Sequence, residues 1–380
     1  MKKILYGISG IGTGHTYRQL PILQHFSRAC RIVLFAYGES YKFYHTYFKN
    51  TRKVTVVRIA IPFYAGNKQG LDFATTARHP ANKNTDFTKI NCEALAKATA
   101  LIGTPDLVIT DYEPLSAQYA YAHNAPLVTL DQQSKYLCGN FPPTLAGETY
   151  KDEVMRLRMF FPKAHARIAC SFFKVNKKQG EKTNVLIFPS TLKNEIQTLK
   201  RKQKPNHTSI LVYISSQRTF RQNARTLINT CASQRNVQFH IFIRNCPTLK
   251  KIPSSITLHE HGDPTFYQIL QECSGIVSTA GHMLLSEAMY LGIPVYAMPL
   301  KVYEQQMNAH IITQNNFGIA HPTFDKRKLA YFIKNIPKFT HSILNDCQVL
   351  LRKPGQKDII NYLEHTFLRN TPKKRTTRGI

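Results

Sequence analysis

The second half of the chain contains the sequence Ser278-Thr-Ala-Gly-His-Met-Leu-Leu-Ser-Glu-Ala-Met-Tyr-Leu-Gly-Ile-Pro-Val-Tyr-Ala-Met-Pro-Leu-Lys-Val-Tyr-Glu-Gln-Gln-Met-Asn-Ala309. A turn of small residues opens a helix, and Glu287 follows about two turns later. Gly292 and Pro294 end this helix before an apolar strand, after which a second polar helix begins. Backbone N–H groups at a helix N-terminus bind anions. The stretch therefore predicts a site for a nucleotide diphosphate sugar.

The side chains of this stretch suggest separate roles in such a site. The turn would bind phosphate, and the carboxylate of Glu287 would accept hydrogen bonds from ribose hydroxyls. Glu304 and Gln305, at the start of the next helix, would bind sugar hydroxyls. His282 is a candidate phosphate donor, although an exposed histidine on a helix turn is the more ordinary interpretation. The candidate donor-binding residues here are Thr279, Ala280, Gly281, His282, Glu287, Glu304 and Gln305.

A further candidate for phosphate binding follows the first predicted strand of the second half, in Tyr213-Ile-Ser-Ser-Gln-Arg218. Ser216 and the N-terminus of the next helix would bond phosphate there. A serine that only caps its helix explains the same pattern nearly as well.

Short apolar runs alternate with amphipathic stretches along the whole chain. This alternation predicts right-handed βαβ units and parallel sheets. In the first half we expect strands at 3–8, 31–37, 54–59, 107–110 and 127–130, and helices near 15–29, 39–49, 88–102 and 113–123. In the second half we expect strands at 209–214, 237–243, 276–278 and 293–298, and helices near 217–232, 264–272, 281–291, 303–314, 324–335, 341–352 and 357–369.

The chain is long enough for two domains, and the repeated pattern predicts two doubly wound α/β halves. We expect an N-terminal Rossmann-like domain over 1–190, a linker over 191–207, a nucleotide-sugar domain over 208–345, and C-terminal helices with a basic tail over 346–380. Residues 62–86 are polar and too long for a simple connection, which is typical of a binding or lid element. Ligands of such folds bind at the carboxyl ends of the strands.

A glycine-rich turn, Gly7-Ile-Ser-Gly-Ile-Gly-Thr-Gly-His15, follows the first predicted strand. Gly10, Gly12 and Gly14 permit a tight turn and a close approach of backbone to ligand. His15 then lies on the first turn of the next helix, at the mouth of the predicted cleft. A dinucleotide-binding turn is the alternative, but the spacing departs from G-x-G-x-x-G.

Asp111 lies where a second apolar strand ends, at the same sheet edge as His15. A carboxylate there would fix the tautomer of a histidine and stabilise its protonated form. An aspartate that caps the next helix is an equally good interpretation. Glu113 is a less favoured candidate for the same catalytic role.

The formal net charge is +29. Such a charge favours anionic partners: phosphorylated substrates, an anionic membrane surface or nucleic acid, although a solvated basic surface produces it too. The eight cysteines show no C-x-x-C spacing, which is typical of reduced thiols in a cytoplasmic protein. No apolar run approaches the length of a membrane span. We therefore expect a cytoplasmic protein, with the inner face of the membrane as a site of peripheral contact.

These motifs resemble those of GT-B glycosyltransferases, in the family-28 (MurG-type) and family-1 UDP-glycosyltransferase patterns, over roughly residues 1–320. The glycine loop that ends in His15 and the strand-end Asp111 match the N-terminal motifs. The donor motif "G…EA…G-x-P…P…(D/E)Q-x-x-NA" is matched by Gly281, Glu287, Ala288, Gly292, Pro294, Pro299, Glu304, Gln305, Asn308 and Ala309. Thr279 departs from the pattern, since the family-1 motif usually carries a histidine there.

The resemblance implies a GT-B fold, with two Rossmann-like domains facing a cleft, and an inverting hexosyl transfer without a metal or other cofactor. His15 would be the general base, supported by Asp111, and a UDP-sugar would be the donor. The acceptor would be an unidentified hydroxyl compound. Met155-Arg-Leu-Arg-Met-Phe-Phe-Pro-Lys163 mixes apolar and basic residues and suggests a lipid or cell-envelope acceptor at an anionic membrane. A buried helix edge explains that segment equally well.

Two other functions remain open at this point. A UDP-sugar epimerase or hydrolase on the same fold would need no second acceptor. A basic nucleic-acid-binding protein would bind in a salt-sensitive manner, but the sequence contains no recognisable nucleic-acid module. We expect no specific nucleic acid as a partner.

Overall fold

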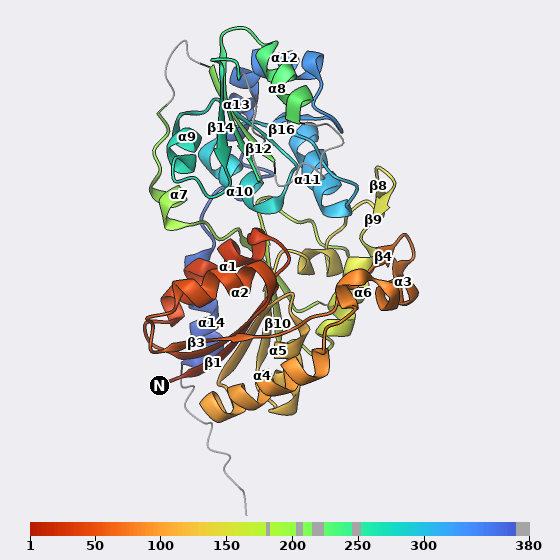
Figure 1. The fold of residues 1–380 in the computed structure, drawn as a ribbon, viewed down its shortest axis with the longest axis vertical. Helices are drawn as coiled ribbons and strands as arrows, with labels where there is room; N and C mark the ends of the chain where they lie inside the picture. Colours follow the sequence, from red (N-terminus) through yellow and green to blue (C-terminus); the bar gives the residue numbers. More distant parts are fainter. Residues whose placement is uncertain (180–182, 203–207, 215–223, 245–251, 370–380) are drawn as a thin grey trace, which may run out of the picture.

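The computed structural model describes residues 1–179, 183–202, 208–214, 224–244 and 252–369. Two α/β domains, each built on a parallel sheet, lie one above the other in Figure 1. The chain passes from the first to the second near its middle. The two sheets confirm the predicted α/β class with two Rossmann-like halves.

The first domain is built on a seven-stranded parallel sheet with the order β11-β10-β7-β6-β1-β2-β3. Apolar side chains alternate between its two faces: Ile4 and Tyr6 pack on one face, and Leu5 packs on the other. Helices therefore cover both faces. The strands are β1 (Lys3–Ile8), β2 (Arg31–Ala36), β3 (Val54–Arg58), β6 (Leu107–Asp111), β7 (Leu127–Asp131), β10 (Ala166–Ser171) and β11 (Val185–Pro189). The helices are α1 (Thr13–Phe26), α2 (Gly38–Tyr47), α4 (Phe87–Ile102), α5 (Pro114–Ala122) and α6 (Lys151–Phe160).

The second domain has a six-stranded parallel sheet with the order β14-β13-β12-β15-β16-β17. Its strands are β12 (Thr208–Ile214), β13 (Val237–Ile243), β14 (Ile256–Glu260), β15 (Gly275–Ser278), β16 (Val295–Ala297) and β17 (Gly318–Ala320). Its helices are α8 (Ala224–Ala232), α9 (Phe266–Glu272), α10 (His282–Leu291), α11 (Tyr303–Gln314), α12 (Lys326–Lys334) and α13 (Ile336–Leu344). A short helix, α7 (Asn194–Thr198), lies in the segment that joins the two sheets.

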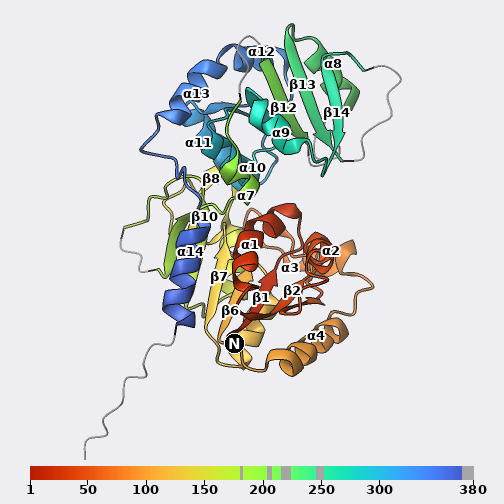
Figure 2. The ribbon, with the colours of Figure 1, turned by 90° about the vertical axis from the view of Figure 1, so that its left-hand side faces the viewer.

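The chain returns to the first domain at its C-terminal end (Figure 2). Helix α14 (Gln356–Leu363) and the turn of π-helix η4 (Glu364–Leu368) pack beside α1 and β11. Ile359 and Leu363 are fully buried in the core of the first domain. The predicted helix over 341–352 is wrong, because α13 ends at Leu344 and the chain then crosses between the domains in a non-helical conformation.

The segment over 62–86 contains small elements rather than an open loop. It forms the hairpin β4 (Gly66–Asn67) and β5 (Gly70–Leu71), helix α3 (Phe73–Arg78) and the 3₁₀ turn η1 (Pro80–Asn82). Arg156 of α6 donates to the Tyr64 carbonyl at 3.1 Å, which fastens the segment to α6. A second hairpin, β8 (Thr144–Leu145) and β9 (Glu148–Thr149), and the 3₁₀ turn η2 (Ser134–Leu137) follow β7.

Candidate functional site

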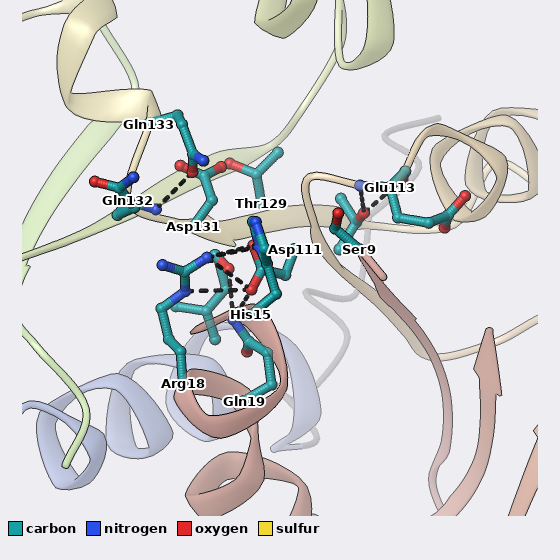
Figure 3. Close-up of polar contacts among 12 residues, drawn as sticks. Ser9, His15, Arg18, Gln19, Asp111, Glu113, Thr129, Asp131, Gln132 and Gln133 are labelled. Atoms are coloured by element: carbon teal, nitrogen blue, oxygen red, sulfur yellow. Dashed lines mark hydrogen bonds and ion pairs between the residues drawn. The ribbon is translucent and has the colours of Figure 1, made fainter. Parts of the chain in front are cut away.

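His15 and Asp111 meet at the carboxyl edge of the first sheet, as predicted. His15 lies in the first turn of α1, directly after β1, and Asp111 is the last residue of the neighbouring β6, where it pairs with Ile8. His15 Nδ1 lies 2.9 Å from Asp111 Oδ1 (Figure 3). The N-cap interpretation of Asp111 is wrong, because Glu113 caps α5.

The carboxylate of Asp111 is fully buried and receives further hydrogen bonds from α1. Arg18 Nη2 lies 2.9 Å from Oδ1 and 3.0 Å from Oδ2, and Gln19 Nε2 donates to Oδ2 at 2.7 Å. Burial alone would raise the pKa of Asp111, but Arg18 and His15 outweigh it and lower that pKa. Asp111 is therefore held ionised.

An ionised Asp111 selects one tautomer of His15. The carboxylate only accepts hydrogen bonds, so His15 satisfies it with a hydrogen on Nδ1. Nε2 is then left with a free lone pair and can take a proton. Arg18 Nη2 also lies 2.8 Å from Nδ1, but a protonated Nδ1 cannot accept from it. In this tautomer the hydrogens of Nη2 are donated to the two oxygens of Asp111.

Glu113 has a structural role. Its carboxylate accepts from the backbone N–H groups of Leu115 and, at 2.9 Å, Ser116. In Figure 3 it lies apart from the His15 cluster. Burial raises the pKa of Glu113 to about 7, although these hydrogen bonds oppose the shift.

The need for glycine differs among the three positions of the loop. A Cβ on Gly10 would lie 2.0 Å from the Tyr37 carbonyl oxygen, so Gly10 is needed for a close approach within the protein. Gly12, the N-cap of α1, has φ of 72°. Gly14 lines the cleft, and a Cβ there would meet Met283 of the second domain at an ordinary 3.8 Å.

The turn before α10 has the features of an anion site. Thr279 and Gly281 line a cavity between the domains, and Gly281 is the N-cap of α10. A Cβ on Gly281 would meet nothing within 4 Å, so open space lies in front of the helix. Ala280 is buried behind the turn with φ of 60°, and its carbonyl accepts from Asn308 at 3.0 Å.

His282 differs from the expected exposed histidine, because only 4% of it is accessible. Both ring nitrogens are buried, and neither has a hydrogen-bond partner among the described residues. The ring packs near Phe172 of the first domain. Burial, with Lys135 and Arg18 nearby, holds the pKa of His282 well below its usual range, so the ring is neutral.

Glu287 faces the same cavity, which has a volume of about 420 Å³ and is lined from both domains. Only 6% of the residue is accessible. Burial raises the pKa of Glu287 to about 7, and Lys193 opposes the shift. No hydrogen bond to this carboxylate is found within the described parts of the chain, which leaves it available to a ligand.

A second cavity, of about 710 Å³, lies against the first domain. Aromatic and apolar side chains line much of it, including Tyr64, Tyr112 and Phe160, and α6 supplies Asp152, Glu153 and Arg156. Five residues line both cavities: Ile11, His15, Gln133, Glu304 and Gln305. The two cavities therefore meet at His15 and the start of α11.

Sequence reasoning missed Arg18, Gln19 and Lys193. The first two were detectable, since residues three and four positions after His15 share its helix face. Lys193 has no local signal, because its neighbours come from distant elements. Ser216 lies outside the described residues.

The described residues contain no group of three or more His, Cys, Asp or Glu placed to hold a metal ion. Within the same part of the chain, no helix is both long and apolar enough to span a membrane.

Comparisons with known proteins agree with this architecture. The family described as "Glycosyl transferase family 1" matches residues 2–337. No curated protein matches the chain.

Several solved structures share the fold at low identity. The glycotransferase of kitacinnamycin has a TM-score of 0.66 at 12% identity, over 96% of this chain and 98% of that one. A UDP-glucosyltransferase from Polygonum tinctorium gives 0.62 at 12%, over 97% and 95%. VinC in complex with DTDP gives 0.58 at 12%, over 96% and 98%. The family match over most of the chain shows that it belongs to glycosyl transferase family 1, and it is a glycosyltransferase with the GT-B fold.

Proposed function

We propose that this glycosyltransferase moves a sugar from a nucleotide diphosphate sugar to a hydroxyl acceptor with inversion at the anomeric carbon, and without a metal. The observation that carries the proposal is the meeting of two cavities at His15. One cavity contains the α10 N-terminus and Glu287, and the other is mostly aromatic and apolar. A donor in the first and an acceptor in the second would have their reacting atoms beside the imidazole.

In this mechanism, His15 Nε2 takes the proton of the acceptor hydroxyl as the oxygen attacks the anomeric carbon. The bond from the anomeric carbon to the diphosphate oxygen breaks, and its electron pair leaves with the diphosphate. The backbone N–H groups at the start of α10 stabilise that negative charge. Asp111 stabilises the imidazolium that forms, and Arg18 and Gln19 keep the carboxylate in place.

The donor is proposed to be a UDP-sugar, with Glu287 bound to the ribose and Glu304 and Gln305 beside the sugar. A thermal-shift series with UDP-, GDP- and dTDP-sugars tests this choice. We expect the UDP-sugars to raise the melting temperature most. A larger shift with dTDP- or GDP-sugars would contradict the choice of base.

NMR analysis of products tests the reaction itself. With donor and acceptor together we expect a glycoside of inverted anomeric configuration, and EDTA should not slow its formation. Epimerised or free sugar from a UDP-sugar alone, at the rate seen with acceptor present, would indicate an epimerase or hydrolase instead.

We further propose a lipid or cell-envelope acceptor presented at an anionic membrane. Helix α6 supports this idea, because one side of it lines the acceptor cavity while Met155 and Met159 are 38% and 41% exposed. Arg158 and Lys163 are exposed beside them. Co-sedimentation should show binding to anionic but not zwitterionic liposomes, weakened by Met159→Glu. No preference between the two kinds of liposome would contradict the membrane proposal.

A further inference from the structure

Lys193 contacts both domains from the segment that joins them. It precedes α7, and its ammonium nitrogen lies 3.5 Å from the ring centre of Tyr17, on α1 of the first domain. The same nitrogen lies 2.9 Å from the hydroxyl of Tyr267, on α9 of the second domain. All three residues line the cavity that contains Glu287.

The ammonium group of Lys193 is partly removed from water. Burial lowers the pKa of Lys193, and the nearby Glu287 and Glu195 oppose that effect. Glu195 is exposed, whereas Glu287 is almost fully buried. A surface lysine that only packed its stem would keep its charged end in water. The Lys193 charge instead lies in the cleft, between two tyrosines and in the cavity that Glu287 also lines.

The ionisation of Glu287 is sensitive to the charged and titratable groups around the cavity. Those that interact electrostatically with Glu287 or with one another are Lys193, Glu195, Tyr17, Tyr267 and Tyr213. Lys193 favours the ionised form of Glu287, while burial and Glu195 favour the neutral form. An ionised carboxylate can accept hydrogen bonds from two hydroxyls at once, and such charge-assisted bonds are stronger than neutral ones.

We propose that Lys193 is a donor-positioning residue. Held between Tyr17 of one domain and Tyr267 of the other, it supplies positive charge to the cavity that Glu287 lines, and this charge keeps the Glu287 carboxylate ready to bind the ribose of a nucleoside diphosphate. The inference rests on the proposed role of this cavity as the donor site. It adds that the joining segment takes part in donor binding.

Calorimetric titration of the full-length protein with UDP tests the role without requiring transfer. We expect Lys193→Met, which keeps most of the apolar stem, to weaken UDP binding on the order of tenfold at pH 7. The loss should shrink toward pH 9, where Glu287 ionises without help. Lys193→Arg should stay within about threefold of wild type, because it retains the charge.

A double-mutant cycle shows whether Lys193 acts through Glu287. In a Glu287→Gln background, Lys193→Met should weaken UDP binding by less than about twofold further. Melting temperatures of the variants show whether each one is folded.

Several results would overturn the proposal. Equal affinity of wild type and Lys193→Met would do so, as would an equal loss at pH 7 and pH 9, or a full tenfold loss in the Glu287→Gln background. If wild type binds neither UDP nor dTDP, the donor site itself is wrong. If wild type binds UDP and only the Lys193 effects are missing, the donor site stands and this role of Lys193 falls.

Discussion

His15 Nδ1 lies 2.9 Å from Asp111 Oδ1, although 96 positions separate the two residues in the chain. Adjacent parallel strands bring them together, since β1 and β6 end at the same sheet edge. The carboxylate is ionised and fully buried, whereas the His15 side chain is 14% accessible and faces the cleft. The pair therefore joins a rigid acceptor of hydrogen bonds to a base that substrate can reach.

Replacing His15 should abolish turnover while leaving donor binding intact. His15→Ala removes the group that takes the acceptor proton, so we expect kcat to fall by about 10²–10⁴-fold. UDP affinity should change by less than about threefold, since the nucleotide contacts proposed above, Glu287 and the backbone at the start of α10, do not include His15. Steady-state kinetics measures the change in kcat, and calorimetry measures the change in UDP affinity. Normal transfer by His15→Ala would exclude the general-base role.

Replacing Asp111 should affect stability as well as catalysis. Asp111→Asn leaves the guanidinium of Arg18, which is 3% accessible, without its buried counter-charge. Breaking such a pair costs about 3–5 kcal/mol of the free energy of unfolding. Urea titration of the variant measures this loss.

Asp358→Asn is the matched control for that measurement. Asp358 pairs with Lys353 at 2.9 Å, but the two side chains are 43% and 65% accessible. Exposed pairs contribute about 1 kcal/mol or less. Equal losses in the two aspartate variants would mean that the Asp111 cluster is not the buried, coupled unit described above.

The βαβ alternation in two halves and the meeting of His15 with Asp111 at one sheet edge were predictable, because both follow from apolar runs that end in polar residues. The β11 strand and the return of α14 were not. Strand β11 is a run of only five residues that ends in Pro189, and a short apolar run alone does not distinguish a strand from another buried segment. The packing of a terminal helix depends on an uncovered patch elsewhere in the fold. The burial of His282 was missed for the same reason, since Phe172 covers it from the other domain.

The glycine loop offers a test of close packing. A methyl group on Gly10 would lie 2.0 Å from the Tyr37 carbonyl oxygen, which is backbone and cannot move aside cheaply. We expect Gly10→Ala to lower the free energy of unfolding by about 1–3 kcal/mol, as overpacking does. Gly14→Ala is the control, because its nearest neighbour is the flexible Met283 at 3.8 Å, and it should change that free energy by less than about 0.5 kcal/mol. Thermal unfolding of both variants would contradict this argument if it ranked them in the opposite order.

Glu113 should make stability depend on pH. Burial raises its pKa from 4.5 to about 7 in the folded protein, so between these values the folded state binds more protons than the unfolded state. The free energy of unfolding then falls as pH rises through this window, and the penalty is fully present above pH 7. A shift of this size corresponds to about 3 kcal/mol.

Glu113→Gln removes the titrating group and keeps an oxygen that can accept from the same backbone N–H groups. The stability of the variant relative to wild type should therefore increase by about 2–3 kcal/mol between pH 4.5 and pH 8. Glu287 titrates in both proteins, so its contribution cancels in the difference. Urea unfolding across this range measures it, with Glu93→Gln on the exposed side of α4 as a control that should run parallel to wild type. A Glu113→Gln curve that also ran parallel would show that folding leaves the pKa of Glu113 unchanged, because the N–H groups of Leu115 and Ser116 offset the effect of burial.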